Sequence, residues 1–305
     1  MQKQTKAYIL TATAVIFWGT AASAFKIALQ YVEPFMLLFY SALVSTLALF
    51  IILVTQGKVS KLRTVTPKSW AMAALLGFIN PFCYYIVLFK AYDLLPGQIA
   101  MSINYGWTLA LTLLSVPILK QTLSRTQLAA IAVSFSGAIV IATEGRFTAF
   151  GEVNMFGVTL AFASTIIWAV FWLLNARDKL DPVFKLFLGF CFGLFYTLIF
   201  SPLFGGINIV KGIALLPLVY IGLFEMGITF VLWLTALQLS STAARIGNLI
   251  YITPFLSLVF LWLVIGEEIH TATWIGLSMI VGSIILQEMQ AKKSRIPEKI
   301  SSESR

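Results

Sequence analysis

One acidic residue, Glu225, lies near the middle of an apolar stretch that is long enough to cross a membrane. A charged side chain at that depth costs about 2.5 to 3.5 kcal/mol on insertion scales, so such residues are rare and mark functional sites by default. The carboxyl of Glu225 can bind a cationic group of a solute, or it can take up and release a proton. The alternative is a structural role, in which the carboxyl bonds a neighbouring helix or pairs with Arg245.

Other polar and aromatic residues inside apolar stretches can complete a binding site around this acid. At helical spacing, Thr229 and Trp233 share a face with Glu225. Asparagines can hydrogen-bond a solute or join two helices. Aromatic rings suit flat or amphipathic organic molecules, and they also serve as ordinary packing and interface residues. The predicted substrate-binding set is Glu225, Asn80, Asn104, Trp18, Trp168, Tyr84, Trp107, Asn248, Thr229 and Tyr251.

Two prolines and one lysine add predictions about movement and access. Pro81 and Pro254 interrupt apolar stretches, so each marks either a bending point for gating or a static kink. Lys26 continues the helical face of Trp18 and Phe25, where its ammonium could attract an anionic group at the outer mouth.

The residue types needed for catalysis are scarce in this chain. The sequence has one histidine, His270, and it shows no metal-ligand spacing, phosphate loop or nucleophile-base pattern. Cys83 and Cys191 both fall inside apolar stretches, which predicts neither a disulfide nor a metal site. We therefore expect no catalytic residue, no metal and no cofactor, with an intramembrane enzyme or a channel as the alternatives.

The composition indicates which solvent surrounds these residues. Apolar residues make up 59% of the chain and charged residues 11%, and the mean hydropathy is +0.92, far from the values of soluble domains. Stretches of about 20 apolar residues can each cross a hydrocarbon core. They fall at 7–29, 34–54, 69–89, 97–119, 126–143, 155–175, 183–204, 213–238, 243–265 and 270–288. The sequence predicts an all-α integral membrane protein with ten transmembrane helices.

The net charge of +9 could suggest a nucleic-acid partner, but membrane topology explains it. If the amino terminus is cytoplasmic, most of the 21 basic residues fall on the cytoplasmic side, as the positive-inside rule requires. The other side keeps only Lys26, Lys90, Arg146 and Lys211. We expect a multi-pass protein of the cell inner (plasma) membrane with both termini cytoplasmic, the lipid bilayer as its surroundings and no nucleic acid as a partner.

The chain contains one block twice. Residues 69–141 align without a gap on 214–286, which places Gly77 on Gly222 and Asn80 on Glu225, and a weaker match places Trp18 on Trp168. Each half is then a unit of five spans, and because five is odd, the second unit is inverted. The predicted division is 1–147 for spans 1 to 5, 148–289 for spans 6 to 10, and 290–305 for a basic cytoplasmic tail too short and polar to fold alone.

The repeat also decides how the amino-terminal segment is interpreted. Lys3 and Lys6, an apolar run and then Ala22-Ser23-Ala24 look like a secretory signal peptide. Cleavage there would leave nine spans and remove the partner of the Trp168 helix, so we interpret the segment as a retained first span.

Several short motifs carry a resemblance to a known family over nearly the whole chain. They are Trp18-Gly19, Pro34, Ala243-Ala244, Thr253-Pro254, Gly266-Glu267, Thr271, Gly276 and Gly282. In this order they resemble the EamA repeats of the drug/metabolite transporter superfamily. The resemblance implies ten helices in two inverted units, and export of small organic metabolites in preference to uptake. Asn104-Tyr105-Gly106-Trp107 is similar to a stretch of the aromatic amino acid exporter branch.

The chain departs from the family pattern at three places. Leu109 and Thr122 stand where the second repeat has Pro254 and Glu267, and Tyr40-Ser41 stands where the family often has a basic residue. The role of that basic residue is not carried over to this chain.

These observations combine into one functional prediction. We expect a secondary active transporter that exports a small-molecule substrate, such as amino acids or amphipathic compounds, by alternating access, with proton coupling as an option. A uniporter or exchanger without proton coupling stays open, as does an intramembrane enzyme such as a lipid-linked group transferase. The sequence patterns do not encode the oligomeric state.

Overall fold

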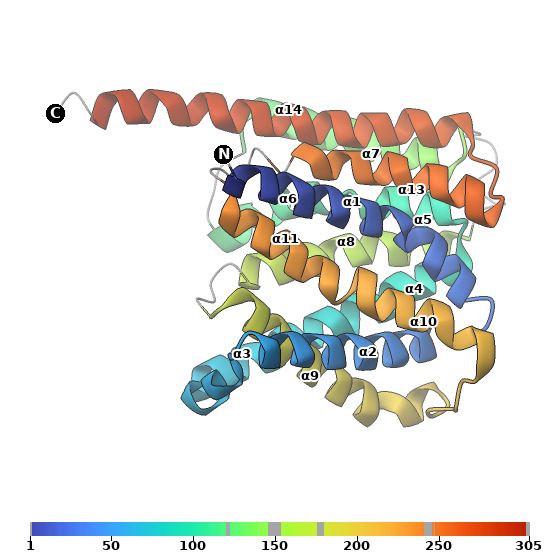
Figure 1. Ribbon diagram of the computed structural model, residues 1–305. Coiled ribbons are helices and arrows are strands. Elements are labelled where there is room, and N and C mark those ends of the chain that lie inside the picture. Colours follow the sequence, from blue (N-terminus) through green and yellow to red (C-terminus); the bar gives the residue numbers. More distant parts are fainter. Residues whose placement is uncertain are drawn as a thin grey trace.

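The computed structural model describes residues 2–119, 123–145, 154–175, 180–240, 246 and 248–302. Within these ranges every regular element is a helix, and no strand occurs (Figure 1). The helices lie side by side in one bundle, and the helix axes run in roughly the same direction (Figure 1). The prediction of an all-α membrane protein is confirmed.

Ten helical rods cross the bundle in the described part of the chain, several of them made of more than one element. The first five rods are α1 (Gln2–Ala28), α2 (Pro34–Thr55), α3–η2–α4 (Pro67–Gly77, Phe78–Cys83, Tyr84–Leu94), α5–α6 (Gly97–Asn104, Trp107–Leu119) and α7 (Arg125–Ala142). The next five are α8 (Met155–Asn175), α9 (Pro182–Phe200), α10–η5–α11 (Leu215–Tyr220, Ile221–Glu225, Ile228–Leu239), η6–α13–η7 (Asn248–Ile252, Thr253–Phe260, Leu261–Ile265) and α14 (Thr271–Ser302). Short helices η1 (Val59–Thr64), η3 (Ser201–Phe204) and η4 (Gly212–Ala214) lie in connections.

Length and hydropathy agree with ten membrane crossings. Among the described residues, seven rods are continuous and apolar enough to span a membrane by themselves. Two shorter apolar segments, Leu249–Ile265 and Thr271–Leu286, give the ninth and tenth rods. The remaining rod is α5–α6, which Tyr105 and Gly106 divide.

The starts of three helices at one end of the bundle follow from their first residues. Thr66 accepts a hydrogen bond from the backbone N–H of Ser69 at 3.2 Å, and proline follows at the first position of α3. Asp181 caps α9 in the same way, and α7 begins with a capping box between Ser124 and Gln127. These caps satisfy backbone donors that membrane helices cannot leave exposed to lipid.

Small residues set the closest helix contacts. α7 and α14 run side by side (Figure 1), and a Cβ atom on Gly137 would lie 2.6 Å from the carbonyl oxygen of Gly276. Ser278 is exposed and Gly282 has open space beside it, because the face of α14 that meets α7 is centred on Gly276.

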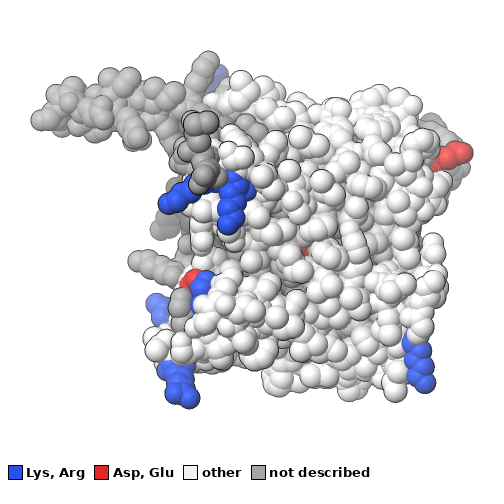
Figure 2. Space-filling model, in the orientation of Figure 1, with Lys and Arg blue, Asp and Glu red and all other residues white. Residues whose placement is uncertain are grey.

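The two ends of the described chain lie at the same end of the bundle (Figure 1). Figure 2 shows that most of the described Lys and Arg side chains visible on this face gather at that end, whereas the middle of the face is largely uncharged. This is the distribution that the positive-inside rule requires for cytoplasmic termini. The residues of the predicted tail continue α14 as helix through Ser302. This extension needs no hydrophobic core of its own, because it adds turns to a helix that has already formed.

Candidate functional site

A cavity of about 500 Å³ lies inside the bundle, and aromatic side chains form much of its wall. We call it the aromatic cavity. Helices α1, α4, α5 and α6 contribute one part of the wall, and α8, η5, α11, η6 and α13 contribute the other. Its aromatic lining is Trp18, Phe25, Tyr84, Tyr92, Tyr105, Trp107, Trp168, Trp172, Phe230 and Trp233. The polar lining is Asn104, Glu225 and Ser257.

Glu225 stands at the end of η5, where the eighth rod is interrupted before α11 begins. One carboxylate oxygen, Oε1, accepts a hydrogen bond from the hydroxyl of Tyr85 at 3.3 Å. The other, Oε2, is buried and has no hydrogen-bond partner among the described groups. The indole N–H of Trp18 donates to the backbone carbonyl of Glu225 at 3.4 Å, which holds that ring beside the acid.

The interruption at Glu225 has a backbone cause. Residues 221–225 form a π-type turn, and Gly227, which follows it, has φ −108° and ψ −90°, outside the helical region. A Cβ atom at Gly227 would lie 2.8 Å from the carbonyl oxygen of Gly222, so the turn needs a residue without one. The side chain of Thr229 donates to the carbonyl of Phe224 across the interruption.

This interruption corrects the predicted face of the eighth span. Thr229 was expected beside Glu225, but it is completely buried and faces away from the aromatic cavity. Trp233, the other residue expected on this face, does line the cavity together with Glu225, and Phe230 and Leu237 line it as well. The prediction assumed a continuous helix of 3.6 residues per turn, and the π-type turn followed by the non-helical Gly227 breaks that spacing next to Thr229.

Asn80, the repeat counterpart of Glu225, also stands at an interruption but does not line the aromatic cavity. It lies in η2 with φ −145° and ψ 121°, directly before Pro81. Its side chain is buried, its Oδ1 has no hydrogen-bond partner in the described structure, and it faces a small void near Asn175 and Lys185. The expectation that Asn80 and Glu225 face one cavity is wrong, because the non-helical backbone at Asn80 turns it away from the face of Tyr84.

The rest of the third rod follows the helical pattern. Tyr84, Leu88 and Tyr92, four residues apart on α4, all line the aromatic cavity. Pro254 occupies the start of α13 after the turn of η6, where a proline fits without a lost hydrogen bond. It therefore begins a helix and does not bend one, whereas Pro81 lies inside η2.

Asn104 joins helices, which is one of its two predicted alternatives, and its contact with a solute stays a prediction. Its amide oxygen accepts from the hydroxyl of Tyr84 at 3.2 Å, and its amide nitrogen donates to Ser164 Oγ at 2.8 Å. It thus joins α4, α5 and α8 while lining the aromatic cavity. Trp168 stacks on Tyr84 with ring centroids 4.5 Å apart, which adds a second contact between α4 and α8.

Six of the ten predicted binding residues line the aromatic cavity: Glu225, Asn104, Trp18, Trp168, Tyr84 and Trp107. Tyr251 is half-buried in η6 and is not part of the lining, although its neighbour Ile250 is. The side chain of Asn248 and the whole of Arg245 lie outside the described residues. Phe230 and Tyr92 line the cavity but were not in the predicted set. Tyr92 could have been found from the sequence, because it continues the four-residue spacing of Tyr84 and Leu88.

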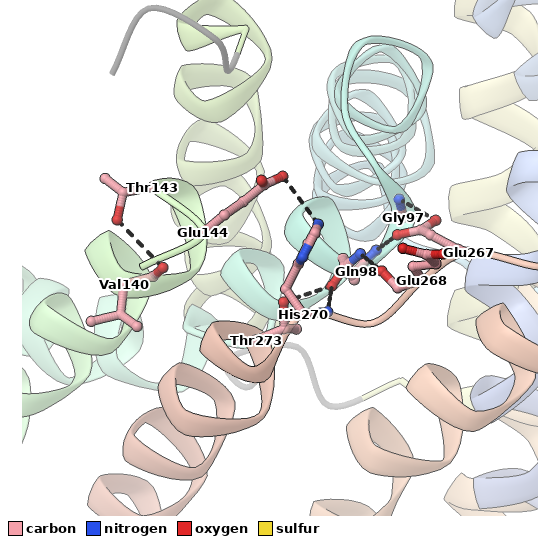
Figure 3. A network of polar contacts seen from close by, with 9 residues as sticks. All are labelled: Gly97, Gln98, Val140, Thr143, Glu144, Glu267, Glu268, His270 and Thr273. Atoms are coloured by element: carbon pink, nitrogen blue, oxygen red, sulfur yellow. Dashed lines mark hydrogen bonds and ion pairs between the residues drawn. The ribbon is translucent and has the colours of Figure 1, made fainter. Parts of the chain in front are cut away.

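A second polar site, drawn in Figure 3, lies where α5 and α14 begin, at the end of the bundle away from the chain termini (Figure 1), and we call it the end network. Its centre is Glu267, whose two carboxylate oxygens accept hydrogen bonds from the backbone N–H groups of Gly97 and Gln98, each at 2.9 Å. These N–H groups begin α5, where a helix terminus favours negative charge. The acid thus fastens the segment before α14 to the start of α5.

Gln98 and His270 extend the end network. The side chain of Gln98 donates to the carbonyl of Glu268 at 2.7 Å and accepts from His270 N and Thr273 Oγ1 (Figure 3). His270 Nε2 lies 3.6 Å from Glu144 Oε1, at the end of α7. Within the described ranges, no three His, Cys, Asp or Glu side chains gather as metal ligands would.

Lys26 also makes contacts at this end. Its ammonium donates to the carbonyls of Tyr92 and Leu95 at 3.0 and 3.1 Å, at the carboxyl end of α4. A cation there satisfies helix carbonyls and complements the helix dipole. Lys26 therefore ties α1 to α4, and these bonds occupy the ammonium that was expected to attract an anionic group.

Comparison with known proteins agrees with this architecture. The model of the EamA-like transporter family matches residues 5–143 and again 155–287. An uncharacterized transporter, YvbV, of Bacillus subtilis is 21% identical over 296 residues, which cover 96% of this chain and 94% of that protein. An uncharacterized transporter of Archaeoglobus fulgidus is 22% identical over 289 residues, with coverages of 92% and 97%. A solved crystal structure shares the fold, with a TM-score of 0.65 and 23% identity over 95% of this chain and 98% of that one.

Proposed function

Because the chain belongs to the EamA-like transporter family, we propose that it is a secondary active transporter that exports a small organic metabolite across the inner membrane by alternating access. The observation that carries this proposal is the aromatic cavity, which has the size of a small-molecule site and whose described wall contains a partly buried acid with one buried, unpartnered oxygen. A buried polar atom without a partner is costly, so its retention beside an internal cavity favours a role in binding.

The arrangement of the helices supports alternating access. If 1–147 and 148–289 are two inverted units, the first contributes α1, α4, α5 and α6 to the cavity wall and the second contributes α8, η5, α11, η6 and α13. Rocking of one unit against the other then changes which end of the cavity is open.

The end network is the proposed closure of one end. It joins Glu267, from the second unit, to the start of α5, from the first, and Lys26 lies beyond the cavity residues Phe25 and Tyr92. With cytoplasmic termini, this closed end faces outward. Release of substrate to the outside then requires the contacts between Glu267 and α5 to break.

The proposed coupling group is Glu225. A carboxyl that exchanges its proton between the two sides can link solute movement to the proton gradient, as ionisable residues inside membrane spans do in other carriers. Exchange of one solute for another, without a proton, is the alternative mode. The Tyr85 hydroxyl holds one oxygen of Glu225 in place, and the other oxygen, which has no hydrogen-bond partner in the described structure, is the proposed contact for the proton or the solute.

The experiment is transport into proteoliposomes under an imposed pH gradient, with labelled aromatic and aliphatic amino acids, nucleosides and organic cations. We expect gradient-dependent movement of one class by the wild type and its loss in Glu225→Gln. The matched control is Glu33→Gln, since Glu33 is exposed and its side chain makes no capping bond at the start of α2. Equal transport by wild type and Glu225→Gln at every pH contradicts the coupling role, and absence of any movement by folded protein contradicts the transporter proposal.

A further inference from the structure

We infer that the aromatic cavity selects organic cations: amphipathic molecules with one positive charge, an aromatic or similarly flat apolar part, and no anionic group. This inference rests on the proposed transport function and specifies its substrate class. It uses three observations: the charges of the cavity wall, its unpartnered polar atoms and the arrangement of its rings.

The charges come first. In the described wall of the aromatic cavity, Glu225 is a carboxylic acid and no Lys, Arg or His side chain is present. The nearby cation Lys26 donates to carbonyls of α4 and is not part of the wall. A solute that enters this site therefore meets negative and not positive charge.

The unpartnered atoms show what such a solute would supply. Glu225 Oε2 is buried without a hydrogen-bond partner in the described structure, and a cationic N–H or ammonium group is the strongest partner for a carboxylate. The indole N–H of Trp172, which also lines the cavity, is likewise buried and unpartnered in the described part of the chain. This neutral donor suits a hydroxyl or carbonyl oxygen elsewhere on the solute.

Three other side-chain donors of this region already have acceptors. Tyr85 donates to Glu225 itself, Trp18 donates to the backbone carbonyl of Glu225, and Asn104 donates to Ser164. A zwitterionic amino acid would bring a carboxylate into a low-dielectric site that already holds a carboxylate, and like charges repel strongly there. The same argument excludes organic anions.

The rings complete the argument. Phe230 lies 5.5 Å from Trp18 and 6.0 Å from Trp168 between ring centroids, and Trp18 is bonded to the backbone of Glu225. Two aromatic residues therefore hydrogen-bond Glu225, Tyr85 at its carboxylate and Trp18 at its backbone carbonyl, and Phe230 and Trp168 continue the aromatic wall from Trp18. Cations bind favourably to aromatic faces, and tryptophan gives the strongest attraction, more so where water is excluded. A buried acid among tryptophans is thus a suitable environment for an organic cation.

The test is a binding series of compounds that all carry a phenyl ring and differ in their charged groups. Phenethylamine is a cation, phenylalanine a zwitterion and 3-phenylpropionate an anion, and phenyltrimethylammonium is a cation that has no proton to release. Binding to the purified full-length protein in lipid nanodiscs is measured by calorimetry and by the quenching of tryptophan fluorescence.

We expect both cations to bind at least about tenfold more tightly than phenylalanine, and the anion to bind weakest. Glu225→Gln should remove this preference, and the exposed Glu33→Gln should keep it. Equal or tighter binding of phenylalanine, a preference that survives in Glu225→Gln, or no binding of any compound by folded protein would each overturn the inference.

Transport of the same compounds in proteoliposomes separates this inference from the proposed function. If cations bind through Glu225 but none moves, the cation site stands and the transporter proposal fails. If phenylalanine moves and the cations do not, the transporter proposal stands and the cation inference fails.

Discussion

Two glutamates of the second half show how differently one residue type can be used in the same bundle. Glu267 places both carboxylate oxygens on backbone N–H groups at the start of α5, in a network where Gln98 and His270 are also bonded (Figure 3). Glu225 lies inside the bundle with one bond to Tyr85 and one buried oxygen without a partner. A satisfied acid contributes to stability, whereas an acid left unsatisfied in a cavity is available to a ligand.

This difference gives opposite expectations for removing the two charges. Loss of Glu267 leaves two helix N–H groups without their acceptor, so it should lower stability. Loss of the charge at Glu225 removes a costly buried group, so it should leave stability unchanged or raise it while transport fails. Each prediction below tests one side of this comparison.

The largest expected effect is on transport by Glu225→Gln. We predict a decrease of about tenfold or more in the initial rate under a pH gradient, because the charged or proton-carrying partner of the solute is lost. The melting temperature in detergent, followed by the fluorescence of the free cysteines after reaction with a thiol dye, should not fall. If Glu225→Gln lowers the melting temperature and transports at the wild-type rate, Glu225 is a structural residue and not a transport residue.

The next effect is on stability at the other acid. Glu267→Ala should destabilise the fold by about 2 kcal/mol, because two charge-assisted bonds to the start of α5 are lost. Glu268→Ala is the matched control, since Glu268 is exposed and enters the end network through its backbone carbonyl. Equal melting temperatures for the two variants would show that the bonds of Glu267 add nothing to stability.

A smaller loss is expected at Gln98. Gln98→Ala should destabilise by about 1 to 2 kcal/mol, because His270 N and the hydroxyl of Thr273 lose their acceptor. Gln98→Glu keeps an acceptor but places a second carboxylate beside Glu267, so it should be no better than alanine. Chemical denaturation followed by circular dichroism measures both, and a stabilised Gln98→Glu would contradict this account of the network.

The sequence predicted the ten rods well because the bilayer fixes their length. A hydrocarbon core about 30 Å thick requires about 20 apolar residues per helix, and the predicted 34–54 and 155–175 lie close to the observed Pro34–Thr55 and Met155–Asn175. Depth along a rod was also predictable. Trp18, Trp168 and Glu225 were chosen because they stand in the middle of spans, and all three line the aromatic cavity.

The direction in which a side chain points was less predictable. Thr229 was placed on the face of Glu225 by helical spacing and Asn80 in the same binding site, and both stand at or next to interruptions that change the register. Pro81 and Gly227 are visible in the sequence, but neither tells how far the backbone turns. The end network could not be predicted from the sequence either, because the hydrogen bond between Glu267 and Gly97 joins residues 170 positions apart and follows no spacing rule.

The smallest effect is expected from Trp18→Phe, which separates the ring of Trp18 from its N–H group. The phenyl ring can still pack on Phe230, but the bond from the indole to the backbone carbonyl of Glu225 is lost. We predict a two- to fourfold decrease in the affinity for phenyltrimethylammonium, about the worth of one weak hydrogen bond and part of a cation-π contact. Trp18→Ala should cost more because it also removes the ring, so equal affinities for the two variants would mean that the ring does not contact the cation.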